Sequence, residues 1–516
     1  MSFAKVYSAQ INFLKANILN IEIDVSIGLH SFSIIGLPDK SIDESKDRVS
    51  SAIKNSGFVS PRSLNKKIVV SLSPADIKKE GTFFDLAIAV CFLLADKQIS
   101  FDPRDKIFLG ELGLDGKIFS IKGALPLVEE ARRKGFKQVF LPEENISQVI
   151  FVKDIKIFGV KSLADVANHL LGLKILAQSK QKTMIQDYLS TENKNDFAKI
   201  KGQQSIKRAL EISATGKHNI AMYGPPGVGK TMLANAFLSI LPDLEYEEIF
   251  EVTSIHSAVG LNKNNLIFHP PFRSPHHTSS YTSIVGGGTN PKPGEITLAH
   301  KGVLFLDEFP EFDRRVIEAL RQPLESKEIT ITRANASIIF PADFILIVSM
   351  NPCPCGYASL KEDLCKCTAV DLYKYKRKLS GPIVDRIDMW VSVGQVDFNI
   401  LNKTEKTETS VEIKKRVIAG RKMGEKIQSS IKQNLTTPID TSIKNIGEID
   451  TNFFDAYSIS QESRELFIQS IEKMSLSMRA YKKILKVART IADLDQSAII
   501  QNKHILEALQ YRPKPM

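Results

Sequence analysis

A glycine-rich octapeptide, set between an apolar run and a helical pattern, constrains the fold of this chain more than any other feature. It consists of Gly224, Pro225, Pro226, Gly227, Val228, Gly229, Lys230 and Thr231. The run 220–223 before it is typical of a buried strand, and residues 232–237 after it favour a helix. In that context the backbone N–H groups and the helix N-terminus point at phosphate groups. The octapeptide therefore predicts a nucleotide-binding loop, with Lys230 on the β- and γ-phosphates and Thr231 on Mg²⁺.

Two further apolar runs end in polar side chains that suit nucleotide hydrolysis. Residues 303–306 lead into Asp307 and Glu308, and residues 344–349 lead towards Asn351. The carboxyl ends of parallel strands meet at one edge of a sheet, so we expect these side chains beside the phosphate loop. Asp307 would hold the Mg²⁺ shell and Glu308 would polarise the attacking water, while Asn351 would orient that water or touch the γ-phosphate. A solvated acidic strand end is the alternative for the two carboxylates.

The order of strand and helix patterns divides the chain into four parts. Alternating strands and helices to residue 172 indicate an α+β domain, and a polar stretch at 173–195 reads as a linker. Buried-strand runs alternate with helices over 196–400, which favours a parallel sheet covered by helices on both faces. Residues 401–516 show helical periodicity and predict a helical C-terminal lid.

Charge and hydropathy limit the kinds of partner and the cell compartment that we expect for this chain. The chain carries 69 Lys plus Arg against 58 Asp plus Glu, a formal charge of +11, which suits a polyanion such as DNA. A merely soluble basic protein is the alternative. The longest apolar run, 86–95, is too short to span a bilayer, so we expect a cytoplasmic protein with reduced thiols and no membrane partner.

Four of the five cysteines cluster within a short stretch of the chain. They are Cys353, Cys355, Cys365 and Cys367. Four thiolates on one loop suit a closed tetrahedral Zn²⁺ site, although the Cys-x-Cys spacing is tighter than the usual Cys-x-x-Cys. Free thiols or a redox pair are the alternatives.

Two segments are candidates for DNA contact. Residues 269–300 form an insert too long and turn-prone for an ordinary connection, and residues 329–340 predict a β-hairpin. Lys292, Lys301 and Arg333 would grip the phosphate backbone without reading bases. The alternative is a solvated hairpin that only packs against its neighbour. A further run of cations and tyrosines, 373–378, would suit phosphate contact or, more often, a solvated helix face.

Taken in order, these motifs resemble the magnesium-chelatase-like AAA+ ATPases of the ComM/YifB competence family over nearly the whole chain. Beyond the ATPase motifs, the segments that carry the resemblance are 202–203, 217–219, 272–278, 286–288, 293–296, 351–356 and 485–493. The resemblance implies a homo-hexameric ring, with assembly on DNA left open, that moves along single-stranded, duplex or branched DNA. It also implies branch migration during recombination of incoming DNA in natural transformation.

The resemblance also assigns roles to individual residues. Asn351 corresponds to sensor 1 and Arg479 to sensor 2 in the helical lid, and Arg321 is a weaker interface candidate. Chemistry alone leaves Arg386 as either an arginine finger or a member of a local ion pair, and the resemblance favours a finger that reaches a neighbouring subunit. The alternative function is the motor subunit of a magnesium-chelatase-like metal-insertion complex, against which the N-terminal domain and the four-cysteine loop argue.

The N-terminal domain resembles the protease domain of Lon without its nucleophile. The stretch 79–85 has no serine where the nucleophile would lie, Thr82 is the only substitute there, and Lys122 is displaced from the position of the partner lysine. We therefore predict no peptidase activity.

Overall fold

The structure of the chain is a computed structural model that forms two compact units, which we describe separately. The first unit comprises residues 1–190 with 249–267, and the second comprises 191–248 with 268–516. The described residues are 2–12, 15–36, 40–74, 79, 81–179, 195–261, 266–288, 291–333, 336–358, 365–379, 381–395, 407–434, 459–474 and 477–512.

A mixed seven-stranded sheet in the order β3-β4-β2-β1-β5-β8-β9 organises the first unit. Its strands are β1 (Ser2–Asn12), β2 (Lys15–Ile27), β3 (Ser31–Ile35), β4 (Lys66–Ser73), β5 (Lys106–Phe108), β8 (Gln138–Pro142) and β9 (Lys156–Val160). A small hairpin consists of β6 (Glu111–Leu112) and β7 (Ile118–Phe119). The helices are α1 (Lys40–Asn55), α2 (Asp85–Ala95), α3 (Ala124–Arg133), α4 (Ile146–Val149) and α5 (Leu163–Leu170). The unit is therefore α+β, as expected.

The apolar run 86–95 lies in the core of this unit as helix α2. All its residues except Leu94 are buried, and Cys91 is among them. Asp85 at the start of α2 is also buried, and its carboxylate pairs with Arg48 Nε at 2.8 Å. The beginning of the expected linker packs on this unit too, since Ser179 N donates to Ile157 O at 2.9 Å. Residues 180–194 lie outside the described residues.

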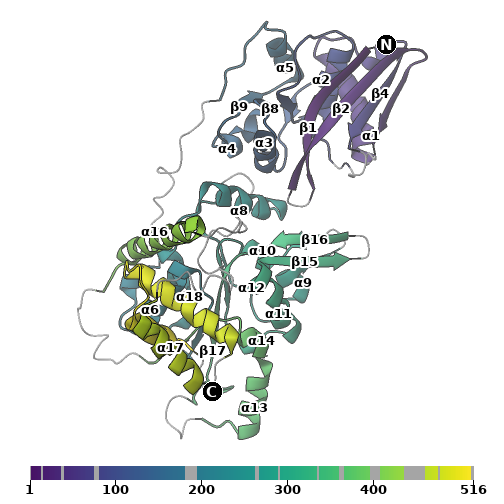
Figure 1. Cartoon of the computed structure of the whole chain (residues 1–516). Coiled ribbons are helices and arrows are strands. Elements are labelled where there is room, and N and C mark those ends of the chain that lie inside the picture. The colour runs from purple at the N-terminus through teal and green to yellow at the C-terminus, as the bar shows by residue number, and fades with distance from the viewer. Residues whose placement is uncertain are drawn as a thin grey trace. The chain divides into compact units, whose positions relative to one another are not determined.

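The second unit is built on a parallel five-stranded sheet in the order β11-β14-β17-β10-β18. The strands are β10 (Ile220–Tyr223), β11 (Phe272–Arg273), β14 (Val303–Leu306), β17 (Ile345–Met350) and β18 (Met389–Ser392). Every residue of β14 and β17 is buried, which is why these strands read as unbroken apolar runs. The expected parallel sheet is confirmed (Figure 1).

Helices and small ribbons surround this sheet. The helices that precede the C-terminal part are α6 (Gln204–Gly216), α7 (Lys230–Phe237), α8 (Tyr246–Ala258, of which only the start belongs to this unit), α9 (Tyr281–Val285), α10 (Glu295–Leu298), α11 (Arg314–Ala319), α12 (Arg321–Ser326), α13 (Ala369–Lys378) and α14 (Gly381–Val384). The two-stranded ribbons pair β12 (Gly286–Gly287) with β13 (Lys292–Pro293), and β15 (Glu328–Arg333) with β16 (Ala336–Pro341). The second ribbon is the hairpin that the sequence predicts.

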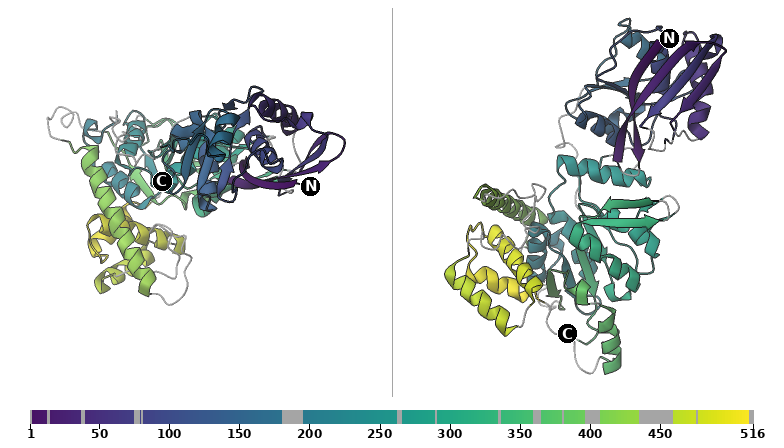
Figure 2. Two further views of the ribbon diagram at one scale, coloured as in Figure 1. Left: turned by 90° about the horizontal axis from the view of Figure 1, so that it is seen from above. Right: turned by 45° about the vertical axis from the view of Figure 1, so that its right-hand side comes forward.

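The C-terminal helices share one hydrophobic core with the sheet. They are α16 (Ser410–Asn434), α17 (Gln461–Lys473), α18 (Met478–Leu494) and α19 (Asn502–Gln510). Figure 2 shows the yellow helices gathered as one group beside the sheet, and Ile413, Phe467 and Leu485 are buried in the same cluster as Ile220 and Phe305. The two expected domains, 196–400 and 401–516, are thus joined in one compact unit.

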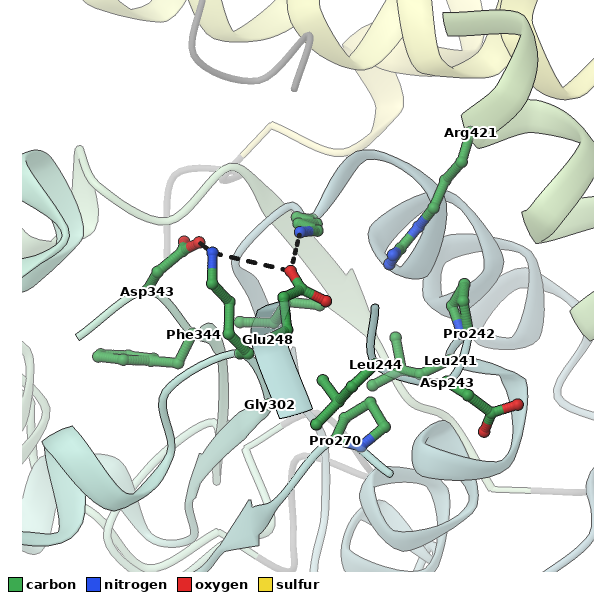
Figure 3. Close-up of a pocket in the computed structure, with 13 residues that line it drawn as sticks. Leu241, Pro242, Asp243, Leu244, Glu248, Pro270, Gly302, Asp343, Phe344 and Arg421 are labelled. Atoms are coloured by element: carbon green, nitrogen blue, oxygen red, sulfur yellow. Dashed lines mark hydrogen bonds and ion pairs between the residues drawn. The ribbon is translucent and has the colours of Figure 1, made fainter. Parts of the chain in front are cut away.

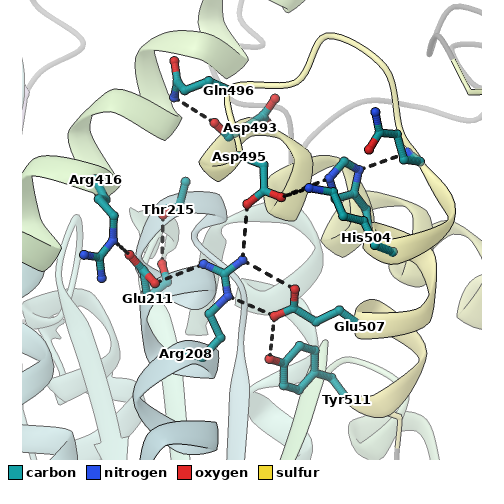
Figure 4. Close-up of polar contacts among 12 residues, drawn as sticks. Arg208, Glu211, Thr215, Arg416, Asp493, Asp495, Gln496, His504, Glu507 and Tyr511 are labelled. Atoms are coloured by element: carbon teal, nitrogen blue, oxygen red, sulfur yellow. Dashed lines mark hydrogen bonds and ion pairs between the residues drawn. The ribbon is translucent and has the colours of Figure 1, made fainter.

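Charged contacts add to this apolar contact between the lid helices and α6. Arg208 of α6 lies within ion-pair distance of three carboxylates, at 3.0 Å from Glu507, 3.2 Å from Glu211 and 3.8 Å from Asp495 (Figure 4). Arg416 of α16 also pairs with Glu211, at 2.5 Å. Among the described residues, no helix is both long and apolar enough to cross a membrane.

Candidate nucleotide-binding and hydrolysis site

The phosphate loop runs from the end of β10 into α7, in the context that the sequence predicts. Gly227 and Gly229 have φ angles of +79° and +89°, a region that side chains with a Cβ rarely adopt. At Gly224 a Cβ would lie 2.1 Å from the carbonyl oxygen of Val393. Gly227 and Gly229 are therefore required by their backbone conformation. Gly224 is required by the close approach of the backbone that follows β18.

Lys230 lies at the centre of this loop. Its Nζ donates to Gly224 O at 2.7 Å, to Pro225 O at 2.9 Å and to Asn351 Oδ1 at 3.0 Å. Partial burial lowers the pKa of Lys230 below its ordinary value, and the charges of Asp307 and Glu308 oppose that change. The contact with Asn351 brings the end of β17 to the phosphate loop, as the sequence predicts.

Asp307 follows β14 and is fixed by three donors. Thr231 Oγ1 donates to Asp307 Oδ2 at 2.8 Å, and the backbone N–H of Glu308 donates to Oδ1 at 3.0 Å. Ser349 on β17 also donates its hydroxyl to Oδ1. A hydroxyl and a carboxylate side by side next to a phosphate loop form the hard oxygen set that Mg²⁺ prefers. The residues present therefore fit a magnesium nucleotide.

Glu308 has a strained backbone and an exposed carboxylate. Its φ is +52°, uncommon for a residue with a side chain, and such outliers concentrate at functional sites. The carboxylate is 55% exposed, and Oε2 lies 3.2 Å from Nδ1 of His277. His277 lies in the segment 272–278, which carries the family resemblance, but no role is expected for it from the sequence. Its position in the long turn-prone insert is the only signal that could have pointed to it.

The loop after β17 packs against the phosphate loop and against α13. A Cβ at Gly356 would lie 2.8 Å from Cδ of Pro226, so the two backbones approach closely there. Tyr375 Oη donates to the backbone oxygen of Asn351 at 3.1 Å. The Tyr375 hydroxyl therefore makes an internal hydrogen bond, whereas Tyr373 is 62% exposed on the same helix.

The same loop carries the four cysteines, and their sulfur atoms converge. The Sγ distances are 3.3 Å for Cys353–Cys355, 3.8 Å for Cys353–Cys365 and 3.6 Å for Cys355–Cys365. With Cys367 included, all four sulfurs lie within 4.8 Å of one another, and none forms a disulfide. Thiolates bound at about 2.3 Å to one tetrahedral zinc lie about 3.8 Å apart, so the set fits Zn²⁺.

Arg386 and Arg479 meet on one carboxylate. Arg479 Nη2 lies 2.6 Å from Oε1 of Glu325, and Arg386 Nη2 contacts the same oxygen. Both arginines line one pocket with Lys483 and Lys486. Arg321 instead pairs with Glu318 within its own helical region, at 2.6 Å. Within the described residues, Arg386 and Arg479 therefore lie together, and both pair with Glu325 rather than with the phosphate loop.

The three cations proposed for DNA occupy different environments. Lys292 is exposed on β13, and the backbone of Arg333 ends strand β15, while its side chain lies outside the described residues. Lys301 is only 20% exposed, and its Nζ lies 2.8 Å from Asp343 and 3.7 Å from Glu248. Figure 3 shows Asp343 and Glu248 lining the pocket in which these ion pairs form. This burial argues against Lys301 as a surface contact for DNA.

Thr82 in the first unit has an acidic partner. Its hydroxyl donates to Glu111 Oε2, and Lys122 is exposed. A nucleophile needs a base that can accept its proton, and the described residues offer Thr82 a carboxylate in place of the lysine of a Lon dyad.

Comparison with known proteins decides the family. The profile "Magnesium chelatase, subunit ChlI" matches residues 196–401, "Subunit ChlI of Mg-chelatase" matches 21–145, and the C-terminal profile of the same subunit matches 407–512. The chain is 39% identical to competence protein ComM of Haemophilus influenzae, over 99% of this chain and 98% of that protein. The chain belongs to the ComM/YifB family of magnesium-chelatase-like AAA+ proteins.

Two further relatives support the same assignment. YifB of Escherichia coli is 38% identical over 99% of this chain and 97% of its own length. An archaeal Lon protease of Methanocaldococcus jannaschii is 32% identical over 20% of this chain and 16% of its own length. The family is confirmed, and the Lon likeness of a part of the chain agrees with the expectation for the N-terminal domain.

Proposed function

We propose that this protein is an ATP-driven motor that acts on branched DNA during the uptake and recombination of incoming DNA. The observation that carries the proposal is the convergence of Lys230, Thr231, Asp307, Glu308 and Asn351 at one sheet edge, in a chain related over its full length to a competence protein. The geometry supports ATP hydrolysis. The similarity to a competence protein supports the proposal that this hydrolysis drives movement on DNA.

The residues of this edge divide the work. Lys230 and the loop N–H groups would hold the phosphates, while Thr231 and Asp307 would hold Mg²⁺, which supplies positive charge to the phosphate oxygens when bound. Glu308 is placed to accept a proton from water, because its carboxylate is exposed and its strained backbone follows directly after Asp307. Asn351 ties Lys230 to the end of β17, so it can report the state of the loop to the rest of the sheet.

The arginines support a ring of identical subunits. Arg386 and Arg479 come from different elements yet end on the same Glu325, which makes one cationic face. Such a face stabilises phosphate charge when supplied by a neighbouring subunit. We infer that both arginines act across an interface in a homo-hexamer, with Glu325 neutralising them when no neighbour is engaged.

The hairpin and β13 are the proposed DNA contacts. Figure 1 shows β15 and β16 at the margin of the second unit, and Lys292 is exposed on the neighbouring insert. Cations on projecting elements hold a phosphate backbone without reading its sequence, which suits a translocating motor.

The four cysteines are proposed to hold a structural Zn²⁺. The fold brings three of the sulfurs to 3.3–3.8 Å from one another, close to the spacing in a tetrahedral set, and the loop that carries them packs on Pro226 and Asn351. A closed site of this kind would fix the loop beside the nucleotide.

The decisive test measures ATP hydrolysis with single-stranded DNA, duplex DNA, a four-way junction, or no DNA, using Glu308→Gln as the inactive control. We expect stimulation by DNA, strongest with the junction, and none in the variant. Hydrolysis that is indifferent to all three DNAs would contradict a DNA motor and favour the motor subunit of a metal-insertion complex.

A further inference from the structure

The turn after α6 makes contacts that nucleotide binding does not explain. Lys217 ends the helix in a left-handed conformation with φ of +54°, which directs His218 into the interior. His218 is fully enclosed, and its Nε2 lies 2.8 Å from Oγ1 of Thr490 on α18. The Thr490 hydroxyl itself donates to Lys486 O at 3.1 Å, so its oxygen accepts from the Nε2–H of a neutral His218. The turn is thereby attached to the lid helix.

Asn219, the next residue, is attached to the loop that carries Arg386. Its backbone N–H donates to Asp388 Oδ2 at 2.9 Å, and its backbone oxygen accepts from the N–H groups of Asp388 and Met389 at 3.0 Å each. Its side-chain oxygen accepts from Leu346 N at 2.9 Å, at the start of β17. One residue therefore connects the Arg386 loop with the strand that ends near Asn351.

A single ion pair closes this network between the two arginines. Lys483 Nζ lies 3.0 Å from Asp388 Oδ1, and the side chains are 14% and 18% exposed. Lys483 follows Arg479 by one helical turn on α18, and Asp388 follows Arg386 by two residues. Burial alone would raise the pKa of Asp388, but Lys483 and nearby donors outweigh it and hold that pKa below its ordinary value. Burial lowers the pKa of Lys483, and the charge of Asp388 opposes that change.

Each arginine thus has a residue close to it in sequence that belongs to the Lys483–Asp388 ion pair, and this pair joins α18 to the Arg386 loop. Arg479 and Lys483 share a helix, and Arg386 and Asp388 share a loop, so the pair fixes the distance between the two guanidinium groups. A pre-set distance matters because charge stabilisation depends on donors that are already in position.

We propose that the Lys483–Asp388 ion pair, seated on the turn 217–219, is a positioning device that holds Arg386 and Arg479 in register for the nucleotide of a neighbouring subunit. Lys483 on α18 and Asp388 directly before β18 both lie outside the phosphate loop, so their loss is expected to lower turnover and to leave ATP binding intact. This inference rests on the proposed trans-acting function of the arginines.

The first experiment compares Lys483→Met with Lys483→Arg and with Lys482→Met, a matched change of the adjacent lysine on α18. We expect Lys483→Met to lower kcat for DNA-stimulated hydrolysis by about tenfold or more with KM for ATP nearly unchanged, because misplacement of such groups by about 1 Å can cost about 100-fold. Lys483→Arg keeps the charge and is expected to recover most of the activity. Equal activities of Lys483→Met and Lys482→Met would overturn the proposal.

The second experiment mixes Lys483→Met with Glu308→Gln in equal amounts. A Lys483→Met subunit keeps its own Lys230, Asp307 and Glu308, and a Glu308→Gln neighbour presents intact arginines to it. The mixture is therefore expected to hydrolyse ATP faster than the sum of the two separate variants. No gain, while Arg386→Ala mixed with Glu308→Gln does recover, would overturn the positioning role and leave the trans-acting arginines standing.

Two provisions keep these outcomes separate. If neither mixture recovers activity, the trans-acting function itself fails and the inference falls with it. If Lys483→Met does not fold, Asp388→Asn takes its place, because the amide still accepts from Asn219 N but removes the charge that Lys483 requires; the same outcomes then apply.

Discussion

At the residue scale, the site combines side chains that the sequence reveals with partners that it hides. The phosphate loop, Asp307 and Asn351 could be placed in advance, because each follows a short apolar run and parallel strands share one edge. His277 and Glu325 could not, because their partners lie far away in the sequence and only the folded chain brings them together.

The contact between His277 and Glu308 predicts a modest catalytic role. Replacing His277 with Ala removes the partner of the Glu308 carboxylate, so we expect a fall in kcat of roughly threefold to tenfold, with ATP affinity unchanged. His276→Ala is the matched control, since His276 Nδ1 contacts Thr278. Equal rates for the two variants, measured at saturating ATP and DNA, would show that His277 does not orient Glu308.

The burial of His218 predicts a pH dependence of stability. Burial lowers the pKa of His218 from 6.5 to about 4, so between these values the unfolded chain binds more protons than the folded one. The stabilisation is present above pH 6.5 and is lost as pH falls towards 4, amounting to about 3 kcal/mol.

The chain's one tryptophan makes this measurement specific to the second unit. Trp390 lies on β18, so its fluorescence follows the urea unfolding of that unit. The loss of stability between pH 7 and pH 5 should be clearly smaller in His218→Gln than in the native chain. An identical loss in both proteins would assign the pH dependence to other groups.

At the element scale, the local sequence pattern was enough to predict the hairpin and the cysteine loop. Contacts between elements could not be predicted from it. Alternation over 329–340 indicated two strands, and the register of β15 with β16 agrees. The use of Tyr375 to hold Asn351 could not be predicted, because the same run of cations and tyrosines is also typical of a solvated helix.

The convergence of the four sulfurs predicts one zinc per chain. Protein prepared with zinc present should contain it at a ratio near one, and Cys365→Ser should lose it, whereas Cys91→Ser, in the core of the other unit, should keep it. Since the loop packs on Pro226, removal with a chelator should weaken ATP binding. A metal content near zero, measured by mass spectrometry, would leave the cysteines as free thiols.

The hairpin predicts a salt-dependent affinity for DNA. Arg333→Ala and Lys292→Ala should each weaken binding to any sequence and flatten the plot of log affinity against log salt by about one unit. Lys415→Ala, a change of an exposed lysine on α16, is the control. Slopes that match the native protein in both hairpin-region variants would remove this surface from the DNA path.

At the scale of the whole molecule, the chain consists of an α+β unit and an ATPase unit whose lid helices share its core. The linker expected at 173–195 stays a prediction. The union of 196–395 with 407–512 could not be predicted, because a helical pattern does not show which sheet it packs on. That union matters for function. It makes Arg479 on α18 and Arg386 beside the sheet parts of one body, as the proposed ring of subunits would require.

The most direct test of this account is branch migration of a mobile four-way junction by the purified full-length protein. We predict that ATP drives conversion of the junction into duplex products, and that Glu308→Gln binds the junction without converting it. A protein that binds the junction and hydrolyses ATP at a DNA-stimulated rate, yet leaves the junction intact, would contradict the central claim.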